Sequence, residues 1–464
     1  MPEHRDQVWI RVVAIAFFAH VGLGMWFVER GLLNADEGWY LYAARQVAMG
    51  FEPYRDFALF QPPVYPQVMA GTVDSGPGVL LTARWVSWVF LCVGTGATVL
   101  AASRLYGVSG AAIAAVGMGL HPVVVNHGVL AKPYGLTALL VGGGLLVLSG
   151  VAGRGTRTAI AFALMGLGVG TRISLAAPIG VLALAQPGRA AALAGLSAGL
   201  GLALHSTIGI DPTVLYDQWV GFHLGNGGTV HDRLGWIANT AMVWGMAWLA
   251  WWPGPRAARL PGLRWAAFVA VLVHALPAAL HVEHVVSVVP LLALACADRW
   301  GATVRRIPWA LVVGAGLTAV AARPYVHLDT AVATVRQTMD LAAWLDANSP
   351  SDAPMITTHL ALAVEADRSV VRGLEMAHFG WVADLDLETA QRTHRMSSAR
   401  LRDAVGRPFS SIVVGERDFD PAGRALLHAA AQADLHTRRT VEDYGQFGVR
   451  VDAFSMDGET LWTR

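Results

Sequence analysis

Long apolar runs recur along most of this chain, and they constrain its fold more than any other sequence feature. They span roughly 15–22 residues each and continue as far as about residue 322, close to the length that a helix needs to cross a bilayer. We interpret them as about eleven membrane spans. The approximate centres are Phe17, Phe90, Ala115, Leu140, Leu164, Val181, Leu196, Trp244, Val271, Leu292 and Val313.

The composition supports an integral membrane protein. Of 464 residues, 54% are hydrophobic and 14% are charged, whereas soluble domains average about 25% charged residues. The formal net charge of +1 gives no electrostatic support for nucleic-acid binding. Cys92 and Cys296 both fall in apolar runs, which disfavours a disulfide framework or a thiolate metal cluster. The first run lacks a small-residue cleavage site, so we expect an uncleaved span rather than a signal peptide.

The arginines indicate an orientation. They precede the first predicted span and follow every even-numbered one: Arg5 and Arg11, Arg104, Arg154 and Arg157, Arg189, Arg256, Arg259 and Arg264, and Arg299, Arg305 and Arg306. Basic loops remain in the cytoplasm. We therefore expect a multi-pass protein of the cell (inner or plasma) membrane with a cytoplasmic amino terminus. Segments 29–78, 121–133, 206–235 and everything after about residue 323 would then lie outside the cytoplasm.

The composition changes after Arg323. Helical and strand-like patterns alternate there, as in "FSSIVVGERDFDPAGRALLHAAAQAD", where a strand pattern precedes a helix pattern. No Gly-rich phosphate loop and no nucleophile elbow occurs in this part of the sequence. We predict a transmembrane domain over 1–323 and a small extracytoplasmic α/β domain over 324–464.

The first outer loop, 29–78, is long, aromatic and acidic. Its stretch "NADEGWYLYAARQVAMG" predicts a helix at the membrane interface, where amphipathic aromatic residues are favoured. Asn34 and Glu37 fit a capping box, and Asp36 complements the helix dipole. Asp36 could equally be a general base beside the membrane. The two interpretations are compatible, because a capped helix fixes the direction of its first carboxylates.

This loop resembles the first outer loop of the GT-C superfamily glycosyltransferases, which include the protein O-mannosyltransferases and the lipid A aminoarabinose transferases. The similarity rests on Asp36-Glu37, Tyr40, Ala43-Ala44, Gly50, Pro53-Tyr54, Asp56 and Pro62-Pro63. Weaker similarity extends over roughly 10–300, in "HPVVVNHGVLAKPYGLTALL", "GLGVGTRISLAAPIGVLAL" and "HVEHVVSVVPLLALACA". The resemblance implies a GT-C-like polytopic fold and a polyprenyl-phosphate-linked sugar donor. It also implies an extracytoplasmic acceptor, which could be a glycan, a lipid or a protein.

The chemistry of such a transfer suggests roles for the site residues. An acceptor hydroxyl must lose a proton, and the departing phosphate must be held by cations or hydrogen-bond donors. We expect Asp36 to be the base and Glu37 to orient it or bind sugar hydroxyls. Inversion by one displacement is expected, since no second carboxylate is assigned as a nucleophile.

Two cations are the best phosphate partners. Arg172 interrupts a Gly-rich apolar region, where a cation is costly and usually functional. Lys132 could serve with it, or could be a snorkelling lysine at the membrane boundary. Further candidate substrate contacts are Tyr40, Tyr54, Asp56, Gln61, His281 and His284. Tyr54, Asp56 and Gln61 could instead only fix the shape of the first outer loop. The His281, Glu283 and His284 triplet lacks the zincin spacing and offers too few ligands, so no cofactor is indicated, and dependence on a divalent metal stays open.

One departure from the family pattern stands out. Many relatives carry an acidic residue in the second outer loop, but "NHGVLAKPYG" has none, so Glu37 or Asp56 would have to supply any second carboxylate. Two other functions remain open. A transporter would fit the Gly-rich spans and Arg172, although no internal repeat relates the two halves. A non-catalytic member of the same family could bind lipid-linked sugar without transferring it.

Overall fold

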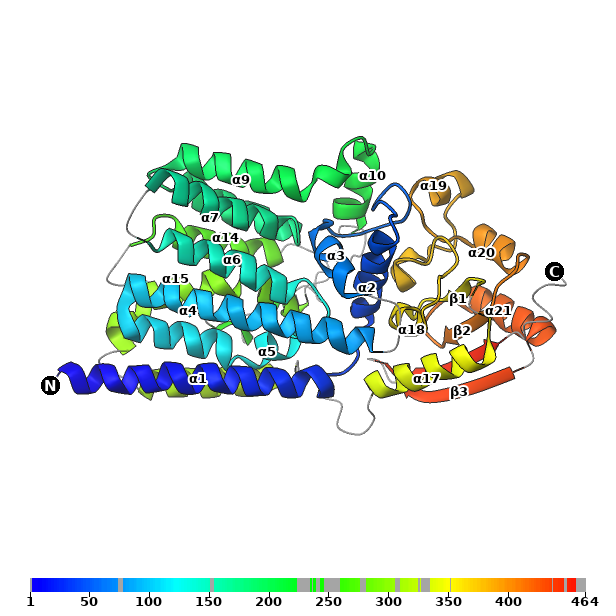
Figure 1. Ribbon diagram of the computed structural model, residues 1–464, viewed down its shortest axis with the longest axis horizontal. Coiled ribbons are helices and arrows are strands. Elements are labelled where there is room, and N and C mark those ends of the chain that lie inside the picture. The colour runs from blue at the N-terminus through cyan, green and yellow to red at the C-terminus, as the bar shows by residue number, and fades with distance from the viewer. Residues whose placement is uncertain are drawn as a thin grey trace. The chain divides into compact units, whose positions relative to one another are not determined.

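The computed structural model forms two compact units (Figure 1). It describes residues 2–73, 78–150, 154–222, 259–275, 281–304, 309–323, 334–350, 352–435, 437–445 and 449–455, with 234, 235, 237, 238, 243–245 and 326 between them. Unit 1 comprises Met1–Val28, Trp85–His205 and Trp219–His327, and unit 2 comprises Glu29–Arg84, Ser206–Gln218 and Leu328–Arg464. The predicted outer loop 29–78 and the first part of the predicted outer segment 206–235, Ser206–Gln218, thus join the C-terminal residues in unit 2, whereas sequence analysis grouped them with the transmembrane domain.

Unit 1 is helical. Its described helices are α1 (Pro2–Arg30), α4 (Val79–Gly119), α5 (Pro122–Gly128), α6 (Tyr134–Leu148), α7 (Arg154–Val169), α8 (Ala176–Leu184), α9 (Arg189–Ala203), α14 (Leu263–Ala275), α15 (Val289–Val304) and α16 (Trp309–Ala322), with short helices η2 (Ile173–Leu175), η3 (His205–Thr207) and η5 (Val282–Val288). Every predicted span centre other than Trp244 lies in one of these helices. Most of the run around Trp244 lies outside the described residues.

Helix α4 contains two predicted spans. Gly107 separates them, because its backbone (φ +75°, ψ −170°) leaves the helical region for a conformation that favours glycine. In the described part of the chain, Asp6–Arg30 and Val79–Gly119 are long and apolar enough to cross a membrane by length and composition. The other apolar helices of unit 1 are shorter. On α1, Ile15 and Phe18 are exposed, which suits a helix whose apolar side faces lipid.

Small residues set the closest helix packing in unit 1. Helices α7 and α9 lie side by side (Figure 1), with Gly195 and Gly199 of α9 against Ala159 and Ala163 of α7. A Cβ atom at either glycine would overlap a carbonyl group of the facing alanine. This Gly-xxx-Gly spacing lets two backbones approach as they do in membrane helix pairs.

In unit 2, the predicted loop helix is α2 (Ala35–Ala48), followed by α3 (Val64–Met69) and η1 (Ala70–Thr72). Helix α2 packs against α3 and against α18 (Leu360–Glu365). Gly38 makes the second contact possible, since a Cβ there would overlap the backbone nitrogen of Ala361. Trp39, Tyr40 and Tyr42 are buried within the protein. The aromatic residues expected at the membrane interface are therefore core residues of unit 2.

The rest of unit 2 is a small α/β structure. Strands β1 (Met355–Thr357), β2 (Ser411–Gly415), β3 (Thr437–Tyr444) and β4 (Val449–Ser455) form one sheet in the order β1-β2-β4-β3, in which only the β1–β2 pair is parallel. The helices are α17 (Thr334–Asn348), α18, α19 (Leu387–Arg392), α20 (Ser398–Val405) and α21 (Pro421–Asp434), with η7 (Ala377–Gly380), α10 (Pro212–Tyr216) and the π-helix η4 (Asp217–Gly221). The predicted helix, strand, helix, strand and helix correspond in order to α17, β1, α18, β2 and α21, and α19 and α20 are additional helices between α18 and β2.

Strands β3 and β4 were not predicted. Most side chains of β3 are exposed or half-buried, and its sequence "TRRTVEDY" is charged. Charged residues are common on edge strands, where they prevent pairing with another chain. They also remove the apolar alternation from which a strand is predicted.

Candidate functional site

The amino-terminal end of α2 is a complete capping box, as predicted. The side-chain oxygen of Asn34 accepts a hydrogen bond from the Asp36 N–H (3.0 Å). The Glu37 carboxylate in turn accepts one from the Asn34 N–H (3.0 Å). This reciprocal arrangement fixes the first turn of the helix. It therefore fixes the direction in which the two adjacent carboxylates leave the backbone.

Glu37 points into the protein. Its carboxylate forms a bidentate ion pair with Arg84, with Nε–Oε1 2.7 Å and Nη2–Oε2 2.6 Å, and both side chains are fully buried. Arg84 also donates to the carbonyl oxygens of Gly31 (2.9 Å) and Leu32 (3.0 Å). Direct contact between Glu37 and a sugar, one of its two expected roles, does not fit this burial. Its burial is compatible with the other expected role, in which Glu37 orients Asp36 by fixing the helix turn that carries both residues.

Sequence analysis missed Arg84. A signal for it exists, because "VLLTARWVSWVFL" places one arginine early in an otherwise apolar run. An isolated cation in such a run is costly and requires a partner. Glu37 is that partner in the structure.

Asp36 differs from Glu37 in being half-buried. Its Oδ1 accepts a hydrogen bond from the Trp39 indole N–H (3.3 Å). Burial lowers the pKa of His378 below its usual value, and the negative charges of Asp36 and Asp418 oppose that shift. Asp36 is therefore an oriented carboxylate that is partly open and within electrostatic range of His378.

The other first-loop candidates shape the loop. Tyr40 stacks on Trp39 with ring centroids 3.5 Å apart, and Tyr65 meets its ring edge-on at 5.2 Å. Tyr54 takes a left-handed backbone conformation (φ +68°), and its hydroxyl donates to the Gln61 carbonyl oxygen (2.6 Å).

Asp56 accepts a hydrogen bond from the Glu52 N–H (2.7 Å) and is half-buried. The hydrogen bonds of Tyr54, Gln61 and Asp56 thus support the alternative in which these residues fix the loop. Tyr40 is likewise a packed core residue.

In unit 1, Lys132 and Arg172 meet at one aromatic ring. Lys132 Nζ lies 5.3 Å from the centroid of the Tyr134 ring, and Arg172 Cζ lies 5.1 Å from it. Lys132 lies between α5 and α6, and Arg172 precedes η2 in the connection from α7 to α8. Both residues are buried. Burial of Lys132 favours an enclosed cation over a snorkelling one.

The predicted histidines lie on η5 in the same unit. The rings of His281 and His284 meet edge-on at 5.2 Å, with His281 exposed and His284 half-buried. Helix η5 contacts α5 and α6. The charges of Arg172 and Lys132 act on His284, and the charge of Lys132 also acts on Glu283. The structure thus gathers Lys132, Arg172 and His284 in unit 1, while Asp36 and Glu37 belong to unit 2.

Comparison with known proteins identifies the class of fold. No family model and no curated protein sequence matches the chain. Among solved structures, the chain is similar to ArnT from Cupriavidus metallidurans bound to undecaprenyl phosphate, at 14% identity and a TM-score of 0.56, over 96% of this chain and 97% of that one. The apo state of the same ArnT gives a TM-score of 0.55 at 14% identity, over the same shares of both chains.

The likeness to ArnT confirms the fold predicted from the GT-C resemblance. It spans both units, so the architecture is that of a polytopic helical membrane protein with a small C-terminal α/β domain. An oligosaccharyltransferase from Archaeoglobus fulgidus is also similar, at 11% identity, over 94% of this chain and 72% of that one, with a TM-score of 0.47.

Proposed function

We propose that this protein is a membrane glycosyltransferase that moves a sugar from a polyprenyl-phosphate donor to an acceptor outside the cytoplasm. The observation that carries the proposal is a capped, half-buried Asp36 carboxylate in a fold similar to that of ArnT bound to undecaprenyl phosphate. A lipid-linked sugar already has a phosphate leaving group on its anomeric carbon. The protein then needs a base for the acceptor and cations for the phosphate.

In the proposed reaction, Asp36 takes the proton from an acceptor hydroxyl. The acceptor oxygen forms a bond with the anomeric carbon as the bond from that carbon to the phosphate oxygen breaks. The electron pair leaves with the polyprenyl phosphate. One displacement on the face opposite the leaving group inverts the anomeric centre. Asp36 suits the role of base because its carboxylate is oriented by the capping box yet partly accessible.

Lys132 and Arg172 are assigned to the phosphate. The two cations lie against one Tyr134 ring, and both residue types form charge-assisted hydrogen bonds with phosphate oxygens. The planar guanidinium of Arg172 can bind two phosphate oxygens at once, whereas Lys132 acts as a point charge. The charges of both cations act on His284, which would therefore border the same phosphate.

The test uses the full-length protein in detergent with a panel of radiolabelled polyprenyl-phosphate sugars and a crude extract of cell-envelope glycans as acceptor. We expect wild type to release polyprenyl phosphate and Asp36→Asn to lose turnover by about 100-fold or more, the usual contribution of a general base. Asp56→Asn, in the same loop, is the matched control and should retain most activity. Full turnover by Asp36→Asn would show that the assigned base is wrong.

The phosphate assignment has a separate measurement. Lys132→Gln and Arg172→Gln should each weaken binding of polyprenyl phosphate by about tenfold, since each removes a charge-assisted hydrogen bond. Unchanged binding in both variants would overturn the assignment. Uptake of a soluble solute into liposomes without sugar transfer would support the transporter instead.

A further inference from the structure

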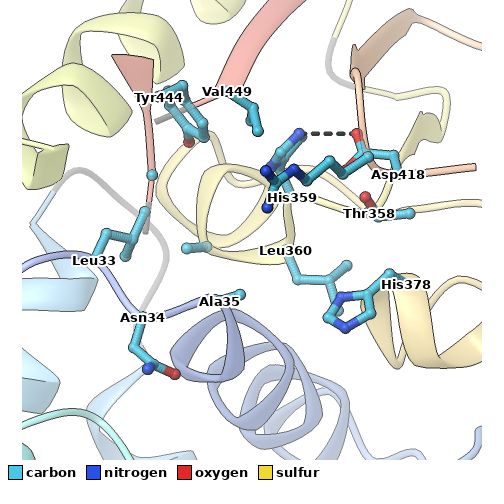
Figure 2. Close-up of a pocket in the computed structure, with 13 residues that line it drawn as sticks. Leu33, Asn34, Ala35, Thr358, His359, Leu360, His378, Asp418, Tyr444 and Val449 are labelled. Carbon is cyan, nitrogen blue, oxygen red and sulfur yellow. Dashed lines mark ion pairs between the residues drawn. The ribbon is translucent and has the colours of Figure 1, made fainter. Parts of the chain in front are cut away.

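A pocket of about 200 Å³ opens in unit 2 beside the start of α2 (Figure 2). Its polar lining comes from five separate parts of the unit: the first loop, the start of α18, η7, the β2–α21 connection and the end of β3. The residues that matter for its chemistry are Asn34, His359, His378, Arg417, Asp418 and Tyr444. None of them was a predicted site residue.

One wall is a fixed ion pair. Asp418 Oδ2 lies 2.9 Å from His359 Nε2 and accepts the Gly415 N–H at 2.5 Å. The dashed line in Figure 2 marks this ion pair. Burial would raise the pKa of Asp418. The charge of His359, together with hydrogen bonds from His359, Gly415 and Thr358, outweighs that effect and keeps the pKa below its usual value. The Asp418 carboxylate is therefore ionised and already matched by donors within the protein.

Among the other polar groups of the wall, Arg417 can only donate, whereas Asn34, Thr358 and His378 can donate or accept. Arg417 is exposed, and His378 carries an imidazole on η7. A guanidinium binds phosphate or carboxylate oxygens through charge-assisted hydrogen bonds, and the imidazole of His378, whose pKa is lowered by burial, can donate a neutral N–H. The Tyr444 ring, which meets the His359 ring edge-on at 5.2 Å, and Val449 supply an apolar wall. Such a lining suits a ligand with an anionic group and a ring that has one apolar face.

The pocket adjoins the proposed base. Asn34 lines it and, through the same side chain, accepts the hydrogen bond from the Asp36 N–H. The negative charge of Asp36 also acts on His378, which lines the same pocket. The backbone that presents His378 is strained, because Ala377 has φ +54°. Strain of this kind persists only where the surroundings enforce it and is concentrated at functional sites.

We propose that this pocket is the acceptor subsite and that the acceptor is an anionic saccharide, one that carries a phosphate or a carboxylate. This inference rests on the proposed function. Arg417 and His378 would bind the anionic group, Tyr444 would pack on the sugar ring, and an acceptor hydroxyl would then face Asp36. The His359–Asp418 pair keeps the wall rigid.

The test measures binding, without turnover, to the full-length protein in detergent by calorimetry. The probes are glucose 1-phosphate and glucuronate, with methyl glucoside as the neutral match. We expect both anionic sugars to bind about tenfold or more tightly than the neutral one, and Arg417→Gln and His378→Gln to weaken that binding about tenfold. Inorganic phosphate at the same concentration should not displace them. Equal binding of neutral and anionic sugars, or displacement by inorganic phosphate, would overturn the saccharide assignment.

Two controls locate the binding. Arg407→Gln changes an exposed arginine of the same unit and should bind the probes as wild type does. Lys132→Gln should also bind normally. If it loses the anionic sugars while Arg417→Gln retains them, the pocket is not their site. Arg417→Lys should recover part of the affinity, which a folding defect in Arg417→Gln would not explain.

Failure of this inference can be told from failure of the proposed function. Asp36→Asn should bind the probes normally, because it changes the base and not the pocket. Full donor turnover by that variant would refute the function and leave the binding result standing. If turnover requires Asp36 but Arg417→Gln leaves the KM for the acceptor unchanged, the pocket assignment fails and the function stands.

Discussion

The buried Glu37–Arg84 ion pair offers the sharpest stability prediction. Arg84→Met retains much of the side-chain volume but leaves the Glu37 carboxylate buried without its guanidinium. It also removes the donors to the Gly31 and Leu32 carbonyl oxygens. Removing one partner of a buried pair costs about 3–5 kcal/mol. In a domain of roughly 200 residues, each kcal/mol lowers Tm by about 2–4 °C, so we expect a loss of roughly 10 °C.

The assay is a double-mutant cycle by thermal unfolding of the full-length protein in detergent. Glu37→Met should destabilise by a similar amount, because it leaves a buried guanidinium. The double variant Glu37→Met/Arg84→Met removes both charges, so its loss should be well below the sum of the two single losses. The matched control is Arg407→Met, which breaks an exposed pair with Asp403 and should cost less than about 1 kcal/mol.

Two outcomes would refute this reasoning. One is a change in Tm for Arg84→Met no larger than that of Arg407→Met. The other is a double variant whose loss equals the sum of the single losses, since the two charges would then not interact. If the pair also orients Asp36, both single variants should lower donor turnover while probe binding at the unit 2 pocket persists below their Tm.

Other parts of unit 2 give further predictions. Burial raises the pKa of Glu375 to about 7 in the folded state, above the unfolded value of about 4.3. Between these two pH values the folded state keeps the Glu375 proton while the unfolded state loses it. The free energy of unfolding should therefore fall by about 3 kcal/mol as pH rises from about 4.5 to 7. Glu375→Gln should flatten that part of the stability–pH curve in thermal unfolding, and the exposed Glu388→Gln should not; an unchanged slope in Glu375→Gln would contradict the assignment. Gly38→Ala should cost about 1–3 kcal/mol by forcing α2 away from the Ala361 backbone, whereas Gly71→Ala, with open space around it, should unfold at nearly the wild-type temperature. Trp39→Phe removes the hydrogen bond to Asp36 and should lower kcat about threefold to fivefold. It also truncates a core side chain, so kcat is measured below the Tm of the variant and compared with that of Trp381→Phe; equal kcat values in the two variants would show that this hydrogen bond does not orient the base.

Much of the fold follows from local sequence. Every predicted span centre other than Trp244 lies in a described helix, and the capping box predicts where α2 begins. Apolar runs and the capping box both involve residues close together in the chain. Strand β3 was not predicted because its charged, mostly exposed side chains lack the alternation of apolar and polar residues from which a strand is predicted.

The site was only partly predictable for a related reason. Lys132 and Arg172 were both expected from the sequence to contact the phosphate, and the structure places them against one Tyr134 ring. The lining of the unit 2 pocket could not be predicted. Asn34 and Asp418 lie hundreds of positions apart, and His359, His378 and Arg417 show no motif spacing. The packing of α18 against α2 brings the first loop to these residues.

The adjacency of Asp36 and Glu37 explains how one short segment can combine structure and chemistry. Successive residues of a helix point about 100° apart, so two neighbouring carboxylates cannot face the same surroundings. Glu37 turns inward to Arg84 and back to the Asn34 N–H, which locks the first turn. Asp36 then leaves that turn in a fixed direction, half-buried, toward the side on which His378 lies. Exchanging the two acids would place the proposed base at the buried position and the carboxylate that should pair with Arg84 at the half-buried one. The order Asp-Glu, and not merely the presence of two acids, is therefore what the proposed chemistry requires.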